Sequence, residues 1–170
     1  MILRPEFTTH LAERLVTGES INLISPHGQG RRRTLQDLRS LMPASLPVQY
    51  IDLRLHQDDL EAVICACLKQ QEQGLLILHN FNLLQNHDLI SQLNAINKLN
   101  HISLLYISED KTLQDLLAAE SVHLPPLSSC QMVAEIKRRR LDPDACTVEQ
   151  LLSDPAPYTA LTTLTGQRVD

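Results

Sequence analysis

Residues 21–38, with the sequence INLISPHGQGRRRTLQDL, decide the fold, because only there do a strand, a glycine loop and a helix follow one another directly. A mostly apolar run ends at Ser25 and passes through Gly28 and Gly30 into a pattern of helical period. Glycines between a strand and a helix are typical of loops whose backbone amides surround a phosphate. The stretch therefore predicts a phosphate-binding loop.

The chemistry of this loop departs from that of a working one. An active loop has the pattern G-x-x-x-x-G-K-[ST], in which the lysine contacts the β- and γ-phosphates and the hydroxyl contacts Mg²⁺. Here Ser25 takes the first glycine position and Gly30 the second. Arg31 takes the lysine position and Arg32 the hydroxyl position. The frame of the loop is kept, and the magnesium ligand is missing.

Three later stretches extend the pattern in the order of a known family. The chain resembles the AAA+/STAND group of P-loop ATPases over residues 6–165. LPVQYIDLR at 46–54 is similar to the second strand of that group, and GLLILHNFNL at 74–83 is similar to its Walker B strand. ISLLYIS at 102–108 is similar to its sensor-1 strand.

The Walker B strand of the family ends in two acids, often within a pattern such as LLLDEFDLL. In this chain His79 and Asn80 stand at the two acidic positions, and Asn82 stands where a third acid often follows. Arg32 and His79 thus replace both expected anchors of the metal, and Asn80 replaces the base that polarises water. Because phosphoryl transfer depends on that metal and on positioning, the resemblance implies that hydrolysis is lost.

The other residues that the family uses are also changed. Ser108 stands at the sensor-1 position. No arginine occurs between Arg54 and Arg138, so no arginine finger is expected, and Pro157 and Tyr158 occupy the region of a sensor-2 arginine. We expect no catalytic residue in this chain.

The succession of apolar runs and helical patterns predicts an α/β fold. Strands expected at 21–24, 48–53, 75–78, 102–107 and 122–124 alternate with helical segments, which favours a five-stranded parallel sheet sandwiched by helices. The family resemblance places strand 21–24 between strands 102–107 and 122–124. A short helix is expected at 111–120, and Asp58 and Asp59 are expected to cap the helix that follows them.

From Ser128 onward only helical periodicity remains. Helical segments expected at 128–141, 147–153 and 156–164 resemble a small C-terminal helical lid. We therefore divide the chain into a P-loop α/β domain, residues 1–127, and a lid-like subdomain, residues 128–170.

Composition agrees with one soluble domain and excludes a global attraction to nucleic acid. The 170 residues carry 15 Lys and Arg against 20 Asp and Glu, a formal net charge of −5. The four cysteines form no C-x-x-C pair, which favours reduced thiols. With no signal peptide and no apolar run of membrane-spanning length, we expect a cytoplasmic protein without a membrane partner.

The candidate site residues lie on the loop or at the ends of neighbouring strands. Three cations at the start of a helix oppose its macrodipole, so an anionic partner is expected there. Three partners stay open for this arginine run: nucleotide phosphate, nucleic-acid backbone, or the carboxylates of a partner protein. The predicted cofactor-binding residues are Gly28, Gln29, Gly30, Arg31, Arg32, Arg33, His79, Asn80 and Ser108.

Two further groups have ordinary explanations. His27 and His79 would lie at the same edge of the sheet, where we favour solvent-facing histidines over a pair that holds a transition metal. Residues 137–140, KRRR, end a helix where cations are favoured, so a solvated helix end accounts for them.

We interpret the chain as a catalytically inactive AAA+/STAND-like P-loop domain that acts as an interaction or regulatory module. Its expected partner is a protein, either an active ATPase or further copies of the chain. No cofactor and no metal are required, and the loop would take ATP or another phosphate anion without Mg²⁺. The alternatives are an ATP-binding protein with weak ATPase activity and a nucleic-acid-associated factor.

Overall fold

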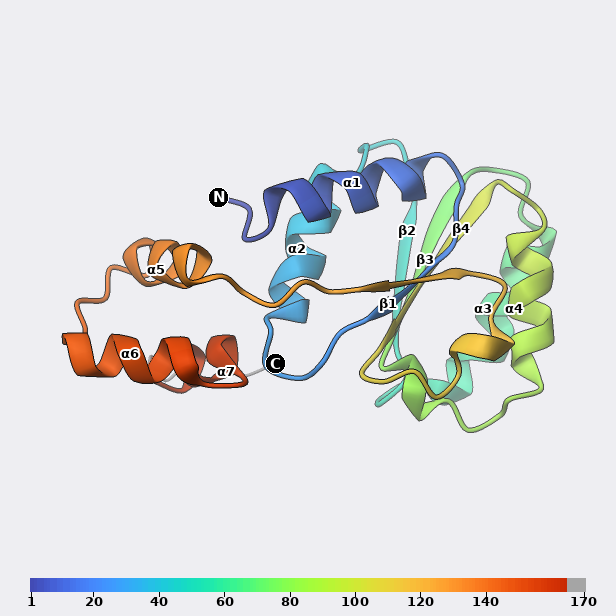
Figure 1. Ribbon diagram of the computed structural model, residues 1–170. Coiled ribbons are helices and arrows are strands. Elements are labelled where there is room, and N and C mark those ends of the chain that lie inside the picture. Colours follow the sequence, from blue (N-terminus) through green and yellow to red (C-terminus); the bar gives the residue numbers. More distant parts are fainter. Residues whose placement is uncertain (165–170) are drawn as a thin grey trace.

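A parallel sheet of five strands forms the centre of the protein, as the computed structural model shows for residues 1–164 (Figure 1). The spatial order of the strands is β2-β3-β4-β1-β5, and every neighbouring pair is parallel. The strands are β1 (Ile21–Ile24), β2 (Val48–Asp52), β3 (Gly74–His79), β4 (Ile102–Ser108) and β5 (Glu120–His123).

Uninterrupted apolar runs explain which strands lie inside the sheet. Every residue of β1, β3 and β4 is buried, because both faces of the sheet are covered. The edge strands β2 and β5 carry exposed or half-buried residues. In the register, Ile24 of β1 lies between Ser108 of β4 and His123 of β5, so the carboxyl ends of these strands meet at one edge.

Helices cover both faces of this sheet (Figure 1). On one face, leucines of the first two helices pack against β1, β3 and β4, and on the other face the next two helices enclose a second core around Phe81 and Tyr106. The helices are α1 (Pro5–Val16) and α2 (Arg31–Leu41), then α3 (Leu60–Lys69) and α4 (Leu89–Asn97).

Three more helices follow the sheet and build a small core of their own. This core consists of Met132, Ile136, Leu151 and Leu161. The helices are α5 (Ser129–Arg138), α6 (Ala145–Ser153) and α7 (Pro157–Leu164). Figure 1 shows them side by side at the end of the molecule that carries the start of α2. The division at residues 127 and 128 stays a prediction, and its last six residues lie outside the described ones.

The predicted α/β fold, its parallel sheet and the neighbours of β1 are confirmed. The helix predicted at 111–120 is wrong: only the 3-10 turn η3 (Gln114–Leu116) forms there, and β5 already begins at Glu120. Asn94 Nδ2 donates to the carbonyl oxygen of Leu116 (2.9 Å), and Asn94 Oδ1 accepts the amide of Ala118 (2.9 Å). A longer helix would need these two backbone groups for its own hydrogen bonds.

The predicted cap of α3 also differs. A 3-10 turn, η1 (Gln57–Asp59), precedes the helix, and Asp59 stands at the cap position in helical conformation without a capping hydrogen bond from its side chain. A third such turn, η2 (Phe81–Leu83), follows β3. Within residues 1–164, no helix has the length and apolar character needed to cross a membrane.

Burial predicts unequal costs for two leucines of α2. Leu38 is fully buried in the core below β1, whereas Leu41 on the same helix is 37% exposed. We expect Leu38→Ala to lower the free energy of unfolding by about 2–5 kcal/mol, because it leaves a cavity. Leu41→Ala, the matched control, should change it by about 0.5 kcal/mol or less. Urea unfolding followed by circular dichroism measures both, and equal losses would contradict the packing described.

Candidate functional site

The loop between β1 and α2 keeps the frame of a phosphate-binding loop. The amide of Ser25 donates to the carbonyl oxygen of Ser108 (2.7 Å), which joins the loop to the end of β4. Gly28 and Gly30 have φ of 90° and 77°, the left-handed region that glycine favours. Gly30 is the residue directly before α2, so the amides of the first helical turn point back toward the loop.

The side chain of Arg31 turns inward and contacts the chain itself. It is 8% exposed, and its Nη2 donates to Asn80 Oδ1 (3.3 Å) while its Nη1 donates to the carbonyl oxygen of Ser25 (3.4 Å). The same Nη1 forms an ion pair with Glu109 Oε1 (3.1 Å), directly after β4. The guanidinium therefore joins the loop to the ends of β3 and β4, and its carboxylate partner belongs to the same chain.

A buried carboxylate that the sequence analysis did not assign to the site, Asp52 of β2, lies next to this contact. Asn80 Nδ2 donates to Asp52 Oδ1 (2.8 Å), which also accepts the amide of Arg54 (3.0 Å). Burial raises the pKa of Asp52, but the hydrogen bonds from Asn80 and from the Arg54 amide outweigh it and hold that pKa below its usual range. The site thus contains a charged acid on β2 that Asn80 connects to Arg31.

One of the two histidines differs from the prediction. His79 is 1% exposed, and its Nδ1 lies 2.5 Å from the hydroxyl oxygen of Tyr50, so the expectation of a solvent-facing His79 is wrong. His27 is exposed, as expected. Residues 1–164 contain no group of three or more His, Cys, Asp or Glu side chains that could hold a metal ion.

Helix α7 fills the space beside the glycines of the loop. The amide of Tyr158 donates to the carbonyl oxygen of Gly28 (3.1 Å). A Cβ added to Gly28 would lie 2.2 Å from Ala156 Cβ, and one added to Gly30 would lie 2.9 Å from Tyr158 Cγ. The glycines therefore fit the start of α7 directly, and larger side chains would displace it.

Gln29 adds a second connection between the loop and the C-terminal helices. Its Nε2 donates to the carbonyl oxygen of Pro155 (2.9 Å), and its Oε1 accepts the amide of Leu127 (3.2 Å). The side chain thus spans the segments that lead into α5 and α7. A residue that the sequence placed beside a nucleotide serves here as a connector between parts of the chain.

A cluster of charged residues centred on Glu135 joins α5 to α2. Glu135 is fully buried, and it accepts hydrogen bonds from Arg33 Nη1 (3.1 Å), Arg138 Nε (2.9 Å) and Arg139 Nε (3.1 Å). Burial alone raises the pKa of Glu135, but the Arg138 hydrogen bond and the Arg33 charge outweigh it and leave the pKa below its usual range. The solvated helix end predicted for 137–140 is therefore wrong for Arg139, whose side chain is 5% exposed, whereas Arg138 is exposed as expected.

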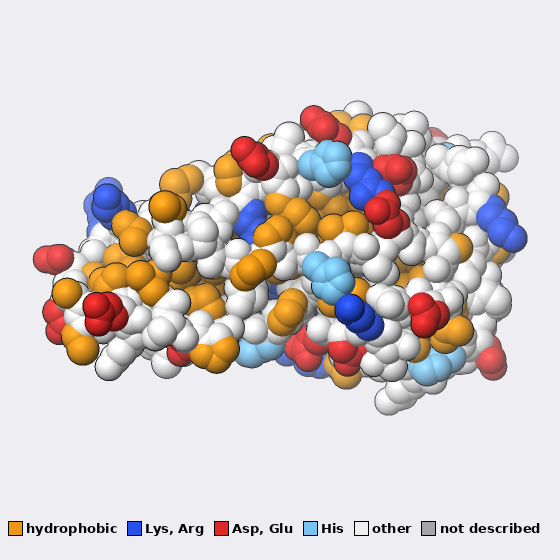
Figure 2. All heavy atoms as spheres, viewed as in Figure 1, with side chains coloured by type: hydrophobic (Ala, Val, Ile, Leu, Met, Phe, Trp, Pro, Cys, Tyr) orange, Lys and Arg blue, Asp and Glu red, His pale blue; other side chains and the backbone are white. Residues whose placement is uncertain are grey.

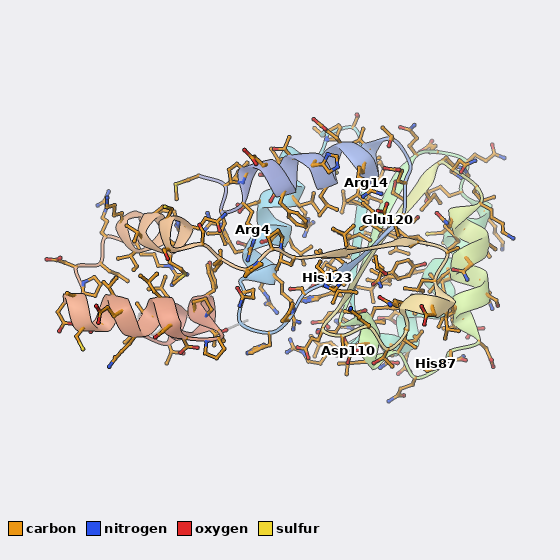
Figure 3. All side chains as sticks on the ribbon, viewed as in Figure 1. Arg4, Arg14, His87, Asp110, Glu120 and His123 are labelled. Carbon is orange, nitrogen blue, oxygen red and sulfur yellow. The ribbon has the colours of Figure 1, made fainter. Side chains whose placement is uncertain are left out.

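Arg4 is a further buried cation that the sequence analysis missed. It is 2% exposed, and it donates to the carbonyl oxygens of Pro125 (2.9 Å) and Gln29 (2.8 Å) and to Thr34 Oγ1 (3.0 Å). Burial lowers the pKa of Arg4 to about 10. Figure 3 shows Arg4 between the start of α1 and α2, and no local motif marks such a residue.

The structure gathers some of the predicted site residues and separates others. Arg33 donates to Glu135 and to Asp37 (3.1 Å each). Arg32 lies half-buried on the first turn of α2, and Ser108 is 3% exposed at the end of β4. The residues that do lie together at the loop and the adjacent strand ends are Gly28, Gln29, Gly30, Arg31, Asn80 and Ser108.

Comparison with known proteins supports the fold and no more. No family model and no curated relative matches the chain. A DNA replication initiation factor is similar in structure (TM-score 0.60, 14% identity, 95% of this chain and 60% of that one). So is AMPPCP-bound DnaA from Aquifex aeolicus (TM-score 0.59, 15% identity, 95% and 61%). The Thermotoga maritima RuvB Holliday junction branch migration motor has a TM-score of 0.57 at 12% identity, and the match covers 100% of this chain and 70% of that one.

The chain spans 60% and 61% of the length of the first two of these proteins. Its five-stranded parallel sheet with flanking helices matches these AAA+ P-loop ATPase structures, at identities that show the fold alone.

The Arg31 contacts predict a stability cost that needs no nucleotide. Arg31→Met keeps the apolar stem and removes the hydrogen bonds to Asn80 and Ser25, so we expect a loss of about 1–3 kcal/mol in the free energy of unfolding. Arg39→Met, on the exposed side of the same helix, is the control and should cost about 0.5 kcal/mol or less. Urea unfolding in the presence of EDTA measures the free energy of unfolding of both variants. An unchanged urea midpoint for Arg31→Met would contradict the role of Arg31 in joining the loop to the strand ends.

Proposed function

We propose that this chain is an AAA+-like domain that has lost nucleotide hydrolysis and acts as an interaction or regulatory module. In this proposal the partner is a protein, either a competent ATPase or further copies of the same chain. The single observation that carries the proposal is the buried guanidinium of Arg31 between Asn80 and Glu109. It occupies the edge of the sheet where hydrolysis would need a metal and a water-polarising acid.

The chemistry of the substituted positions supports this proposal. In working P-loop enzymes a hydroxyl and an acid anchor Mg²⁺. In this chain Arg32, a cation, replaces the hydroxyl, and His79, a buried imidazole in contact with Tyr50, replaces the acid. Asn80 is an amide and therefore has no carboxylate that could polarise a water molecule, and its Nδ2 donates to Asp52. A positive side chain and an amide thus replace the metal and the base together.

A second candidate function is metal-free binding of an oxyanion, including ATP. One observation favours it: within residues 1–164, the buried atoms Ser25 Oγ, Arg31 Nε and Thr159 Oγ1 have no hydrogen-bond partner. Thr159 Oγ1 would lie 3.3 Å from a Cβ on Gly28, so these groups flank the loop. An anion would have to displace the start of α7, which makes any such binding weak.

The nucleic-acid alternative has less support. The two arginine-rich segments that could contact phosphates are the start of α2 and the end of α5, and Arg33, Arg138 and Arg139 of these segments are bound to Glu135. On the face in Figure 2, Lys and Arg side chains are scattered among Asp and Glu side chains. Nucleic-acid binding normally needs cations that are grouped on one face.

The proposal predicts that magnesium-dependent ATP turnover equals the buffer blank. The triple variant Arg32→Thr, His79→Asp, Asn80→Glu restores the missing ligands, and we expect it to remain without turnover because the chain lacks an arginine finger. A coupled phosphate-release assay on protein purified from two different hosts measures this. Steady turnover that follows the protein through both purifications would overturn the proposal.

The module role has its own test. An affinity-tagged copy, expressed in the cells from which the chain comes and purified in EDTA, should recover an ATPase with complete Walker motifs in a fixed stoichiometry. The same ratio is expected with Mg²⁺ and ATP present. Recovery of this chain as a monomer under both conditions would contradict the module role.

A further inference from the structure

The cluster around Glu135 connects α2 to the C-terminal helices, in addition to the hydrogen bonds of Gly28 and Gln29 described above. Arg138 and Arg139 reach Glu135 from its own helix, α5, whereas Arg33 reaches it from α2, which begins at the loop. Arg33 also donates to Asp37 Oδ1 (3.1 Å) on its own helix. Arg33 is therefore the link between the loop helix and the C-terminal helices in this cluster.

The same cluster reaches the loop through Tyr158. The guanidinium carbon of Arg139 lies 5.0 Å from the centre of the Tyr158 ring, a cation–π distance. The Tyr158 ring also lies against Gly30, since a Cβ on Gly30 would be 2.9 Å from Tyr158 Cγ. Glu135 thus positions Arg139, Arg139 faces Tyr158, and Tyr158 covers the glycine before α2.

We propose that Glu135 and Arg33 form a latch that holds the start of α7 on the loop as a plug. The plug consists of Ala156, Tyr158 and Thr159. The proposal rests on the proposed function, because it names the device that keeps the vestigial loop closed. In this proposal the chain's own side chains keep the loop covered. Separation of Arg33 from Glu135 would release the plug from the loop.

The origin of the three cations explains why this contact can act as a latch. Glu135 is fully buried, and of the three arginines that donate to it only Arg33 belongs to α2. Loss of the Arg33 contact leaves Glu135 paired with its own helix alone, so α5 is no longer tied to α2 by an ion pair. Arg139, which holds the Tyr158 ring through the cation–π contact, then no longer belongs to a cluster that is fixed to α2.

A tryptophan reporter tests the latch, because the chain contains no tryptophan. In Tyr158→Trp the indole takes the ring position between Arg139 and Gly30, and tryptophan is the aromatic side chain that cation–π contacts favour most. Acrylamide quenching of this fluorophore measures how well the plug covers the loop. Acrylamide is neutral, so it does not compete for the arginines.

We expect the quenching constant of the reporter to rise at least about twofold when Arg33→Gln or Glu135→Gln is added, because release of the plug increases collisional access to the indole. Arg138→Gln is the matched control: it also removes an arginine from Glu135, but one that belongs to the same helix. It should leave the quenching constant within the error of the reporter protein. Circular dichroism before each titration shows which variants keep the native helix content.

Equal quenching in the reporter protein, Arg33→Gln and Glu135→Gln would overturn the latch. An increase of the same size in Arg138→Gln would overturn it as well, since a general weakening of the cluster would then explain the result. If Glu135→Gln does not fold, Arg33→Gln against Arg138→Gln still decides the matter. None of these results depends on ATP turnover or on a partner, so failure of the latch is distinguishable from failure of the proposed function.

Discussion

The contact between the Arg31 guanidinium and the ends of β3 and β4 is the constraint on which the site depends. It joins the loop after β1 to Asn80 and Glu109, and all three stand at the same edge because the strands are parallel and in register. In this position the side chain provides one positive charge and several hydrogen-bond donors. Contacts within the chain thus join this edge of the sheet to the loop.

Asn80 is suited to this edge in a way that an acid would not be. Its amide accepts a hydrogen bond from Arg31 and donates one to the buried carboxylate of Asp52, so it uses both of its polar atoms. A carboxylate at this position would face Asp52 as a like charge. Asn80 also has a φ of 57°, a left-handed conformation that asparagine tolerates better than most residues.

The arginine run at the start of α2 opposes the helix macrodipole, and the structure compensates it with carboxylates from distant segments. Arg31 pairs with Glu109 and Arg33 pairs with Glu135, in addition to Asp37 on its own helix. The sequence analysis expected an anion from outside the chain, and it did not foresee that Arg31 and Arg33 have carboxylate partners within the chain. This accounts for an arginine-rich loop without assigning a ligand to it.

The fold was predictable because its main strands are unbroken apolar runs, as in β3 and β4, and because the glycine loop fixes one strand–helix junction. The absence of a helix at 111–120 was not predictable, since the competing hydrogen bonds come from Asn94, more than twenty residues away in the sequence. The loop lies between a strand and a helix as predicted, but the contact between Arg33 and Glu135 spans 102 residues and has no local signal.

Asp52 and Arg4 were missed for a similar reason. An aspartate at a strand end and an arginine before a helix are common in sequences. Their roles appear only when Asn80 and Gln29 are brought beside them by the fold.

The central claim is that the chain's own side chains hold the loop closed in place of nucleotide and metal. The most direct test is the thermal unfolding midpoint of the unmodified protein in EDTA and in about 1 mM ATP with excess Mg²⁺. A ligand at a hundred times its Kd stabilises a protein by about 2.7 kcal/mol, which raises the midpoint by several degrees. This account predicts a change of less than about 1 °C, and a magnesium-dependent rise of several degrees would contradict it.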